Sequence, residues 1–270
     1  MRLALKFAYD GRKFGGFARQ PCRRTVEGDI IAALQSLRIL RSGASPAEIR
    51  YGAASRTDAG VSAIGNVIAF DTSFRRESLL PALNARLENI WFHSIAEVPE
   101  DFHPRNALMR WYRYHLRVEE TGDYEELKRA LRSFVGKHDF RNFCRPEGRS
   151  TVRSIRRVRV RRTGSFITVD FFSKGFLWSQ VRRMVGAALG VSRGEFQLSE
   201  LKSALDEPEK RADFPLAPPE PLFLMDVSYS FDFKKDERAV GLVRRALERR
   251  RAEAEQTFIL AGYLAGSFPP

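Results

Sequence analysis

The order of strand-like and helix-like segments constrains the fold of this chain more than any other feature. Apolar and polar residues alternate over residues 3–8, and Thr25 then stands as an N-cap before a helical pattern of apolar residues. Further strand patterns cover residues 67–70, 90–98 and 112–118, and a second helix is expected near 76–87. This β-α-β-α-β order favours an α+β fold over repeated βαβ units.

The second half of the chain repeats the theme. Strand patterns are expected at 156–160, 166–172 and 222–229, helices at 124–135, 178–191 and 200–205, and a charged C-terminal helix at 236–255. We therefore expect an α+β fold in which two similar halves share a large mixed, mainly antiparallel sheet, with a cleft where they meet. The expected divisions are 1–118, 119–232 and a helical extension, 233–270.

The charge of the chain points to a polyanionic partner. The 270 residues include 46 Lys and Arg against 33 Asp and Glu, a net charge of +13, and basic surfaces bind nucleic acids by releasing counterions from phosphates. An anionic membrane surface is the rival partner, but the sequence has no apolar run long enough to span a bilayer and no convincing amphipathic helix. The N-terminus lacks the pattern of a signal peptide, which favours a cytoplasmic location, or a nuclear one in a eukaryote.

Cofactor motifs are not evident in the sequence. Cys22 and Cys144 lie far apart, and the four histidines lack metal-ligand spacing. Neither a phosphate-binding G-x-x-x-x-G-K-[ST] loop nor a dinucleotide-binding G-x-G-x-x-G motif occurs. We therefore expect no metal and no nucleotide cofactor, and chemistry that side chains perform alone.

One carboxylate stands out for its neighbours. Asp58 lies between Arg56 and Gly60 in the run A-S-R-T-D-A-G-V-S-A, residues 54–63, just before an expected strand. An arginine can bind a phosphate or stack on a base, and a glycine lets a ligand approach closely. In so basic a chain, the run predicts a carboxylate that acts on nucleic acid.

A row of arginines marks one expected hairpin strand. Alternation places Arg157, Arg159 and Arg161 on one face and Val158 and Val160 on the other. Like charges in a row repel each other unless a polyanion compensates them, which favours RNA backbone contact over a merely solvated face. In the C-terminal helix glutamates interleave with the arginines, so we favour an exposed charged helix there.

Five segments together resemble the TruA-type tRNA pseudouridine synthases. In chain order they are Y-D-G-R-K-F-G-G-F at 9–17, the run at 54–63, V-P-E-D-F-H-P-R at 98–105, R-W-Y-R-Y at 110–114 and F-L-W-S-Q-V-R-R-M-V-G at 176–186. Their order and spacing are far more specific than any one motif. Ser62 stands where bacterial members commonly have histidine, which indicates an archaeal or eukaryotic type.

The resemblance implies the pseudouridine synthase fold and the isomerisation of uridine to pseudouridine in RNA, without a cofactor. Asp58 would be the nucleophile or the base that starts a glycal route, Arg182 its partner, and Tyr112 a residue that stacks on the target base and takes part in proton transfer. Leu177 would pack on the uracil, and Arg56 would fill the gap left by the flipped base or hold its phosphate.

The same resemblance implies tRNA as the partner, modification of the anticodon stem-loop at positions 38 to 40, and a homodimer. Two alternatives remain open: a pseudouridine synthase with another tRNA or RNA target, and a non-catalytic RNA-binding protein. The intact set of Asp58, Tyr112 and Arg182 disfavours the second, because binding alone would not require a carboxylate that repels phosphate.

Overall fold

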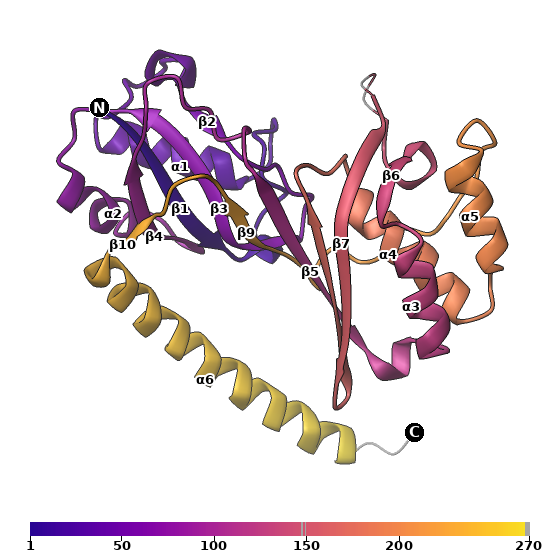
Figure 1. Cartoon of the computed structure of the whole chain (residues 1–270). Helices are drawn as coiled ribbons and strands as arrows, with labels where there is room; N and C mark the ends of the chain where they lie inside the picture. The colour runs from indigo at the N-terminus through magenta and orange to yellow at the C-terminus, as the bar shows by residue number, and fades with distance from the viewer. Residues whose placement is uncertain (147, 149, 268–270) are drawn as a thin grey trace.

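A computed structural model describes residues 1–146, 148 and 150–267 of the chain; residues 268–270 of the expected extension lie outside that range (Figure 1). The strands of the described chain are β1 (Arg2–Tyr9), β2 (Gly52–Ala53), β3 (Ser62–Asp71), β4 (Ile90–Glu97), β5 (Met109–Arg117), β6 (Gly136–Asp139), β7 (Val152–Thr163), β8 (Phe166–Ser173), β9 (Leu222–Ser228) and β10 (Lys234–Lys235). The α-helices are α1 (Val26–Ser36), α2 (Arg76–Asn84), α3 (Tyr124–Arg132), α4 (Gln180–Ser192), α5 (Leu198–Asp206) and α6 (Glu237–Ser267).

All these strands belong to one sheet, in the order β10-β4-β1-β3-β9-β5-β8-β7-β6, with β2 paired to β3. Every strand pair is antiparallel except β3 and β9, which run parallel. The expected α+β fold with a large mixed, mainly antiparallel sheet is confirmed.

Strand β9 joins the two halves of the sheet. It comes late in the sequence but lies between β3 and β5, where Ser62 pairs with Phe223 and Tyr112 pairs with Leu224. The segments around Ser62 and Tyr112, on either side of β9, are therefore held in register by a strand from the end of the core. The sequence pattern of β9 does not indicate its neighbours, because strand pairing depends on contacts between segments far apart in the sequence.

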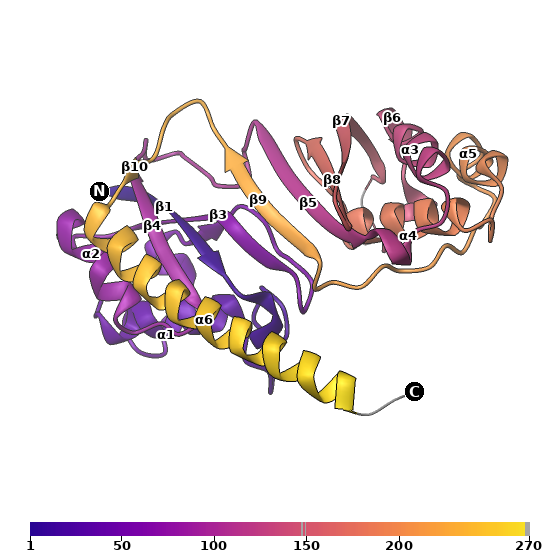
Figure 2. The same ribbon diagram turned by 90° about the horizontal axis from the view of Figure 1, so that it is seen from below.

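The α-helices of the core bury apolar faces against the sheet (Figure 2). Thr25 caps α1 as expected, its Oγ1 accepting a hydrogen bond from the N–H of Gly28 at 3.2 Å. Helix α4 is buried almost all round and packs against α3. Since a buried helix has little freedom to shift, the side chains at its N-terminus have fixed positions.

Helix α6 is longer than the sequence pattern predicted. The expected helix ended at Glu255, where the charged residues stop, but the helix continues to Ser267 through a largely apolar stretch that includes Gly262 and Gly266. Its first half packs along β4, with the Arg250 guanidinium 5.1 Å from the Trp91 ring centroid. Its last turns extend away from the sheet (Figures 1 and 2). The short strands β2, β6 and β10 were not predicted, because they are too short to show alternation.

Candidate active site

Asp58 lies in a tight turn immediately before β3. The backbone C=O of Asp58 accepts a hydrogen bond from the N–H of Val61 at 3.2 Å, and Gly60 has φ +86°. A Cβ at Gly60 would lie 2.8 Å from Pro219 Cγ, so the turn requires glycine for both its conformation and its packing. The turn thus brings Asp58 against the segment that follows α5.

Two donors from the other half of the molecule hold the Asp58 carboxylate. Arg182 Nη1 and Ser179 Oγ each donate to Asp58 Oδ2, both at 2.8 Å. The Arg182 and Asp58 side chains are 13% and 17% exposed, so water screens this ion pair only weakly. Charge-assisted hydrogen bonds of this length are strong and fix the position of a carboxylate.

A backbone C=O group between α5 and β9 fixes the Arg182 guanidinium. Arg182 Nε donates to the C=O of Ala217 at 2.8 Å, so the group is bonded to both Asp58 and the chain segment between α5 and β9. That segment crosses α4 closely: a Cβ at Gly186 would lie 1.9 Å from the Pro215 C=O oxygen. The close crossing at Gly186 brings Ala217 within reach of Arg182.

Tyr112 lies on β5 and faces the same site. Its side chain is 7% exposed and its ring lies 5.2 Å from that of Phe176 in an edge-on arrangement. Burial raises the pKa of the Tyr112 phenol to about 12, with the negative charge of Asp58 adding to the effect and Arg110 and Ser55 opposing it. At neutral pH the phenol is therefore protonated.

Arg110 is a further residue of the cavity lining and connects several segments around the site. Its side chain donates to Ser55 Oγ at 3.0 Å and to the C=O groups of Ala54 and Arg105 at 2.7 and 3.1 Å, and it also bonds the C=O of Lys174. Burial lowers the pKa of Arg110. By joining the strand before Asp58 to the segment after β8, this arginine fixes the two sides of the site relative to one another.

These groups line one cavity of about 980 Å³ at the seam between the halves. Arg56 and Leu177 line the same cavity as Asp58, Tyr112 and Arg182. Among the described residues lining it, Asp58 is the one carboxylate, whereas the cationic side chains are Arg23, Arg56, Arg105, Arg110, Arg145, Arg153, Lys174 and Arg182. A cavity with this charge balance suits a phosphate-bearing ligand that presents one reacting group to Asp58.

The arginine row of β7 lies elsewhere. Arg157 pairs across the strands with Phe172, whereas Tyr112 pairs with Phe171, and side chains on successive residues point to opposite faces. Arg157, Arg159 and Arg161 thus share the sheet face opposite Tyr112, where the Arg157 guanidinium lies 4.5 Å from the Phe172 ring centroid. RNA contact through these three arginines remains a prediction, which would require RNA to reach that second face.

Two side chains that line the cavity, Ser179 and Arg110, were not identified from the sequence. Ser179 stands at a variable position of the family motif, and its contact with Asp58 depends on a left-handed backbone, φ 57° and ψ 12°. Arg110 opens the R-x-Y-x-Y motif, but the pattern does not reveal that it binds backbone C=O groups. Its lack of an acidic neighbour in the sequence is the one signal that could have indicated such a role.

The described residues show neither a metal-binding group nor a membrane-spanning helix. Across 1–146, 148 and 150–267, no group of three or more His, Cys, Asp or Glu side chains is arranged to hold a metal ion. In the same residues, no helix combines the length and the apolar character needed to cross a membrane.

Comparison with known proteins agrees with the geometry. The sequence model of a family described as tRNA pseudouridine synthase matches residues 130–230. The tRNA pseudouridine synthase A of Pyrococcus abyssi is 43% identical over 93% of both chains, and that of Thermococcus sibiricus is 43% identical over 98% of this chain and 99% of its own. The enzyme of that name from Natronomonas pharaonis is 40% identical over 97% of this chain and 98% of its own.

A solved structure titled as a Cbf5-Nop10-Gar1 complex aligns over 68% of this chain and 46% of its own with 13% identity and a TM-score of 0.36, which is too distant to carry an argument. The sequence relatives carry the assignment, and they are archaeal, in agreement with the interpretation of Ser62. With extensive identity over nearly the whole length, the chain belongs to the TruA family of tRNA pseudouridine synthases, which are isomerases.

Proposed function

We propose that this enzyme isomerises uridine to pseudouridine at positions 38 to 40 in the anticodon stem-loop of tRNA. One observation carries the proposal: a single carboxylate, Asp58, is held by Arg182 and Ser179 in a cavity whose other charged lining residues are cationic. The finer choice of stem-loop and position comes from the family resemblance. A target uridine would have to leave its base stack to reach a site this enclosed.

The reaction breaks the N1–C1′ bond of uridine, turns the uracil and joins C5 to C1′, while C5 loses a proton and N1 gains one. Asp58 would start it, either by attack on C1′ or by removing the proton on C2′. Both hydrogen bonds from the protein go to Oδ2, so Oδ1 is the atom that we assign to the reaction. Either route needs an ionised carboxylate, and the Arg182 guanidinium holds the Asp58 carboxylate in place through Oδ2.

The remaining lining residues have positioning roles in this proposal. Tyr112 would stack on the uracil, and its phenol would give its own proton to N1 and take up the C5 proton, so that it is neutral again when the reaction ends. Leu177 is half-buried, and its N–H donates to Gln180 Oε1 at 2.8 Å, which fixes it at the start of α4 where it would pack on the uracil. Arg56 is exposed at the cavity and suits a contact with the phosphate of the flipped nucleotide.

Tritium release from tRNA that carries [5-³H]uridine tests this function, because the C5 hydrogen leaves only if the glycosidic bond is remade at C5. We expect release with the parent enzyme and none with D58N, while D58N binds tRNA as tightly or more tightly because a charge that repels phosphate is gone. Mapping the modified uridines then decides between positions 38 to 40 and another RNA target. Tight RNA binding without release from any tRNA would instead support a non-catalytic RNA-binding protein.

We also propose that the enzyme acts as a homodimer in the cytoplasm. Beyond Arg251, α6 carries Glu253 and Glu255 but no Lys or Arg, and its side chains Phe258, Ile259, Leu260 and Leu264 are about half or more exposed. A surface of this kind favours contact with a second copy over contact with RNA. Sedimentation of the enzyme and of an F258S/L260S variant tests this: the parent should form dimers and the variant should shift toward monomers, whereas a monomeric parent would contradict it.

A further inference from the structure

Trp178 is a large aromatic side chain exposed within the cavity that holds Asp58. It is 43% exposed, whereas Phe17 and Tyr112, which line the same cavity, are buried. It precedes Ser179, the residue whose hydroxyl bonds Asp58. An aromatic ring exposed in a cavity lined by cationic side chains is suited to stacking on a nucleic acid base.

The indole is held in place from one side. The Arg145 guanidinium lies 4.2 Å from the centroid of the Trp178 ring, and the backbone N–H of Arg145 donates to the Trp178 C=O at 2.9 Å. A cation stacked on an aromatic face is an attractive contact. Because Arg145 covers one face, the opposite face of the indole is the one available to a ligand.

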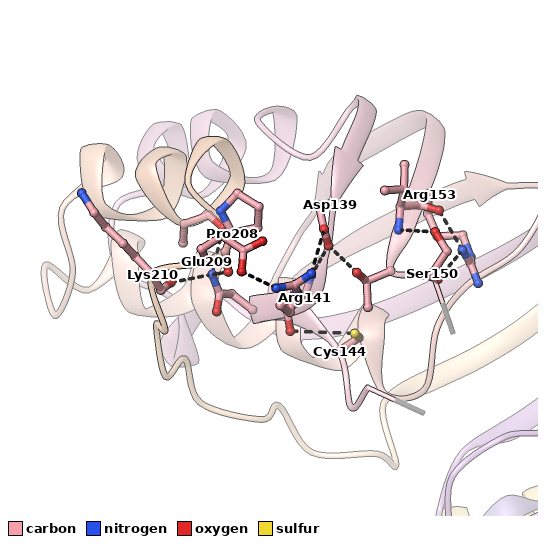
Figure 3. A network of polar contacts seen from close by, with 12 residues as sticks. Asp139, Arg141, Cys144, Ser150, Arg153, Pro208, Glu209 and Lys210 are labelled. Carbon is pink, nitrogen blue, oxygen red and sulfur yellow. Dashed lines mark hydrogen bonds and ion pairs between the residues drawn. The ribbon is translucent and has the colours of Figure 1, made fainter. Parts of the chain in front are cut away.

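The segment that carries Arg145 is anchored in the core. Asn142 Nδ2 donates to the C=O groups of Ala204 and Lys210 at 3.1 and 2.9 Å, and Arg141 forms an ion pair with Glu209. Figure 3 shows this network, in which the side chain of Asp139 also binds Arg141. Arg145 therefore follows a fixed stretch of chain, and the Arg145–Trp178 stack is preformed.

The charge around the stack suits a nucleic acid backbone. The cavity lining next to Trp178 includes three cations, Arg145, Arg153 and Lys174. Within the described residues, none of the three forms a salt bridge. Grooves that bind unpaired nucleic acid combine such cations with aromatic side chains on which bases stack. The arrangement here has both parts within one cavity.

We propose that Trp178 is the stacking platform for an unpaired RNA base next to the target uridine, with Arg145 binding the adjoining phosphate. This inference rests on the proposed function, since it requires RNA in the cavity. The flipped uridine would occupy the space between Asp58 and Tyr112, and its neighbour would lie on the open face of the indole. Stacking reads the shape of any base, so the contact orders the loop without selecting a sequence.

The test uses stem-loop RNAs with 2-aminopurine on either side of the target uridine, bound to the D58N enzyme so that no turnover follows. We expect the fluorescence of one of the two probes to be quenched on binding. W178F should retain the quenching, whereas W178L should lose it and bind the RNA about 10- to 100-fold more weakly. W178L keeps apolar bulk, and a thermal melt equal to that of the parent would show that it folds.

Leu108 offers a control, because it is an exposed apolar side chain, 61% exposed, just before β5 and outside both the cavity lining and the arginine row of β7. L108A should leave both quenching and affinity unchanged. W178L that binds and quenches like the parent, or L108A that loses as much as W178L, would overturn the proposal. If the parent releases tritium from tRNA while W178L is normal, only this inference fails; if the parent neither releases tritium nor binds RNA, the proposed function fails as well.

Discussion

Arg182 Nη1 and Asp58 Oδ2 lie 2.8 Å apart although 124 positions separate the two residues in the sequence. Asp58 belongs to the turn before β3, and Arg182 to the first turn of α4 in the other half of the molecule. The geometry of the proposed site therefore depends on how the halves pack across β9. A change that shifts one half against the other should affect activity before it affects either half's own fold.

We expect R182K to lower the rate of pseudouridine formation by at least about 100-fold, although it keeps the charge. A lysine cannot bond Asp58 and the Ala217 C=O together, because it lacks the fork of the guanidinium. R182M should be less stable as well, by about 3 kcal/mol, since it leaves the Asp58 carboxylate without its cation in a mostly buried site. Single-turnover rates and urea unfolding would measure the two effects.

The control for this pair is R156M, which removes an exposed arginine of β7. It should leave the single-turnover rate within about twofold of the parent. An R182K enzyme with the parent's rate would mean that charge alone, and not the bonding pattern, is what Asp58 requires.

The hydrogen bond from Ser179 to Asp58 predicts a loss of activity that can be separated from changes in stability. S179A removes one hydrogen bond to the carboxylate and should lower kcat by about 10-fold, which corresponds to about 1.4 kcal/mol. S179G removes the same bond but suits φ 57° better, so it should be as slow as S179A yet more stable by about 1 kcal/mol. Rates from tritium release and melting temperatures give the comparison, and a difference in kcat between the two variants would argue against the hydroxyl as the cause.

A substitution at Gly186, where α4 packs against the segment between α5 and β9, should also disturb the site of Asp58 and Arg182. A Cβ at Gly186 would lie 1.9 Å from the Pro215 C=O oxygen, so G186A must push the crossing segment away from α4. Because that segment supplies the Ala217 C=O to Arg182, we expect a loss of about 2 kcal/mol in stability together with a lower kcat.

A Gly→Ala substitution at Gly241 should have the opposite effect on stability. This glycine lies in α6 with nothing within 4 Å of a Cβ, so G241A should raise the stability slightly, by up to about 1 kcal/mol, and leave kcat unchanged. Urea unfolding and steady-state rates of both variants would reveal the difference. An active and fully stable G186A would show that the crossing can move without consequence.

Local patterns sufficed to predict most elements, whereas the set of Asp58, Tyr112 and Arg182 came from the family resemblance. Alternation and helical spacing placed β1, α1 and α4, and the three side chains line one cavity. Local patterns could not predict the order of the strands in the sheet, because the neighbours of β9 depend on long-range pairing. Ser179 was missed for a related reason: its role comes from a left-handed backbone that serine rarely adopts.

Buried tyrosines predict how stability changes at alkaline pH. Burial raises the pKa of Tyr112 to about 12, above the value near 10 of an exposed tyrosine, and it also raises the pKa values of Tyr9, Tyr114 and Tyr229. The unfolded chain therefore loses these protons first, and the stability that they contribute is complete below about pH 10 and declines as the pH rises toward 12. For Tyr112 alone, a shift of about two units corresponds to about 3 kcal/mol.

Y112F removes that phenol and should make the decline of the unfolding free energy shallower by about 1.4 kcal/mol per pH unit between about pH 10 and 12. Urea unfolding of parent and variant across this range measures the slope. Parallel curves would mean that the Tyr112 phenol ionises in the folded enzyme as easily as in the unfolded chain. A shallower slope for Y112F would establish that the folded enzyme holds the Tyr112 proton more firmly than the unfolded chain does, as burial of the phenol requires.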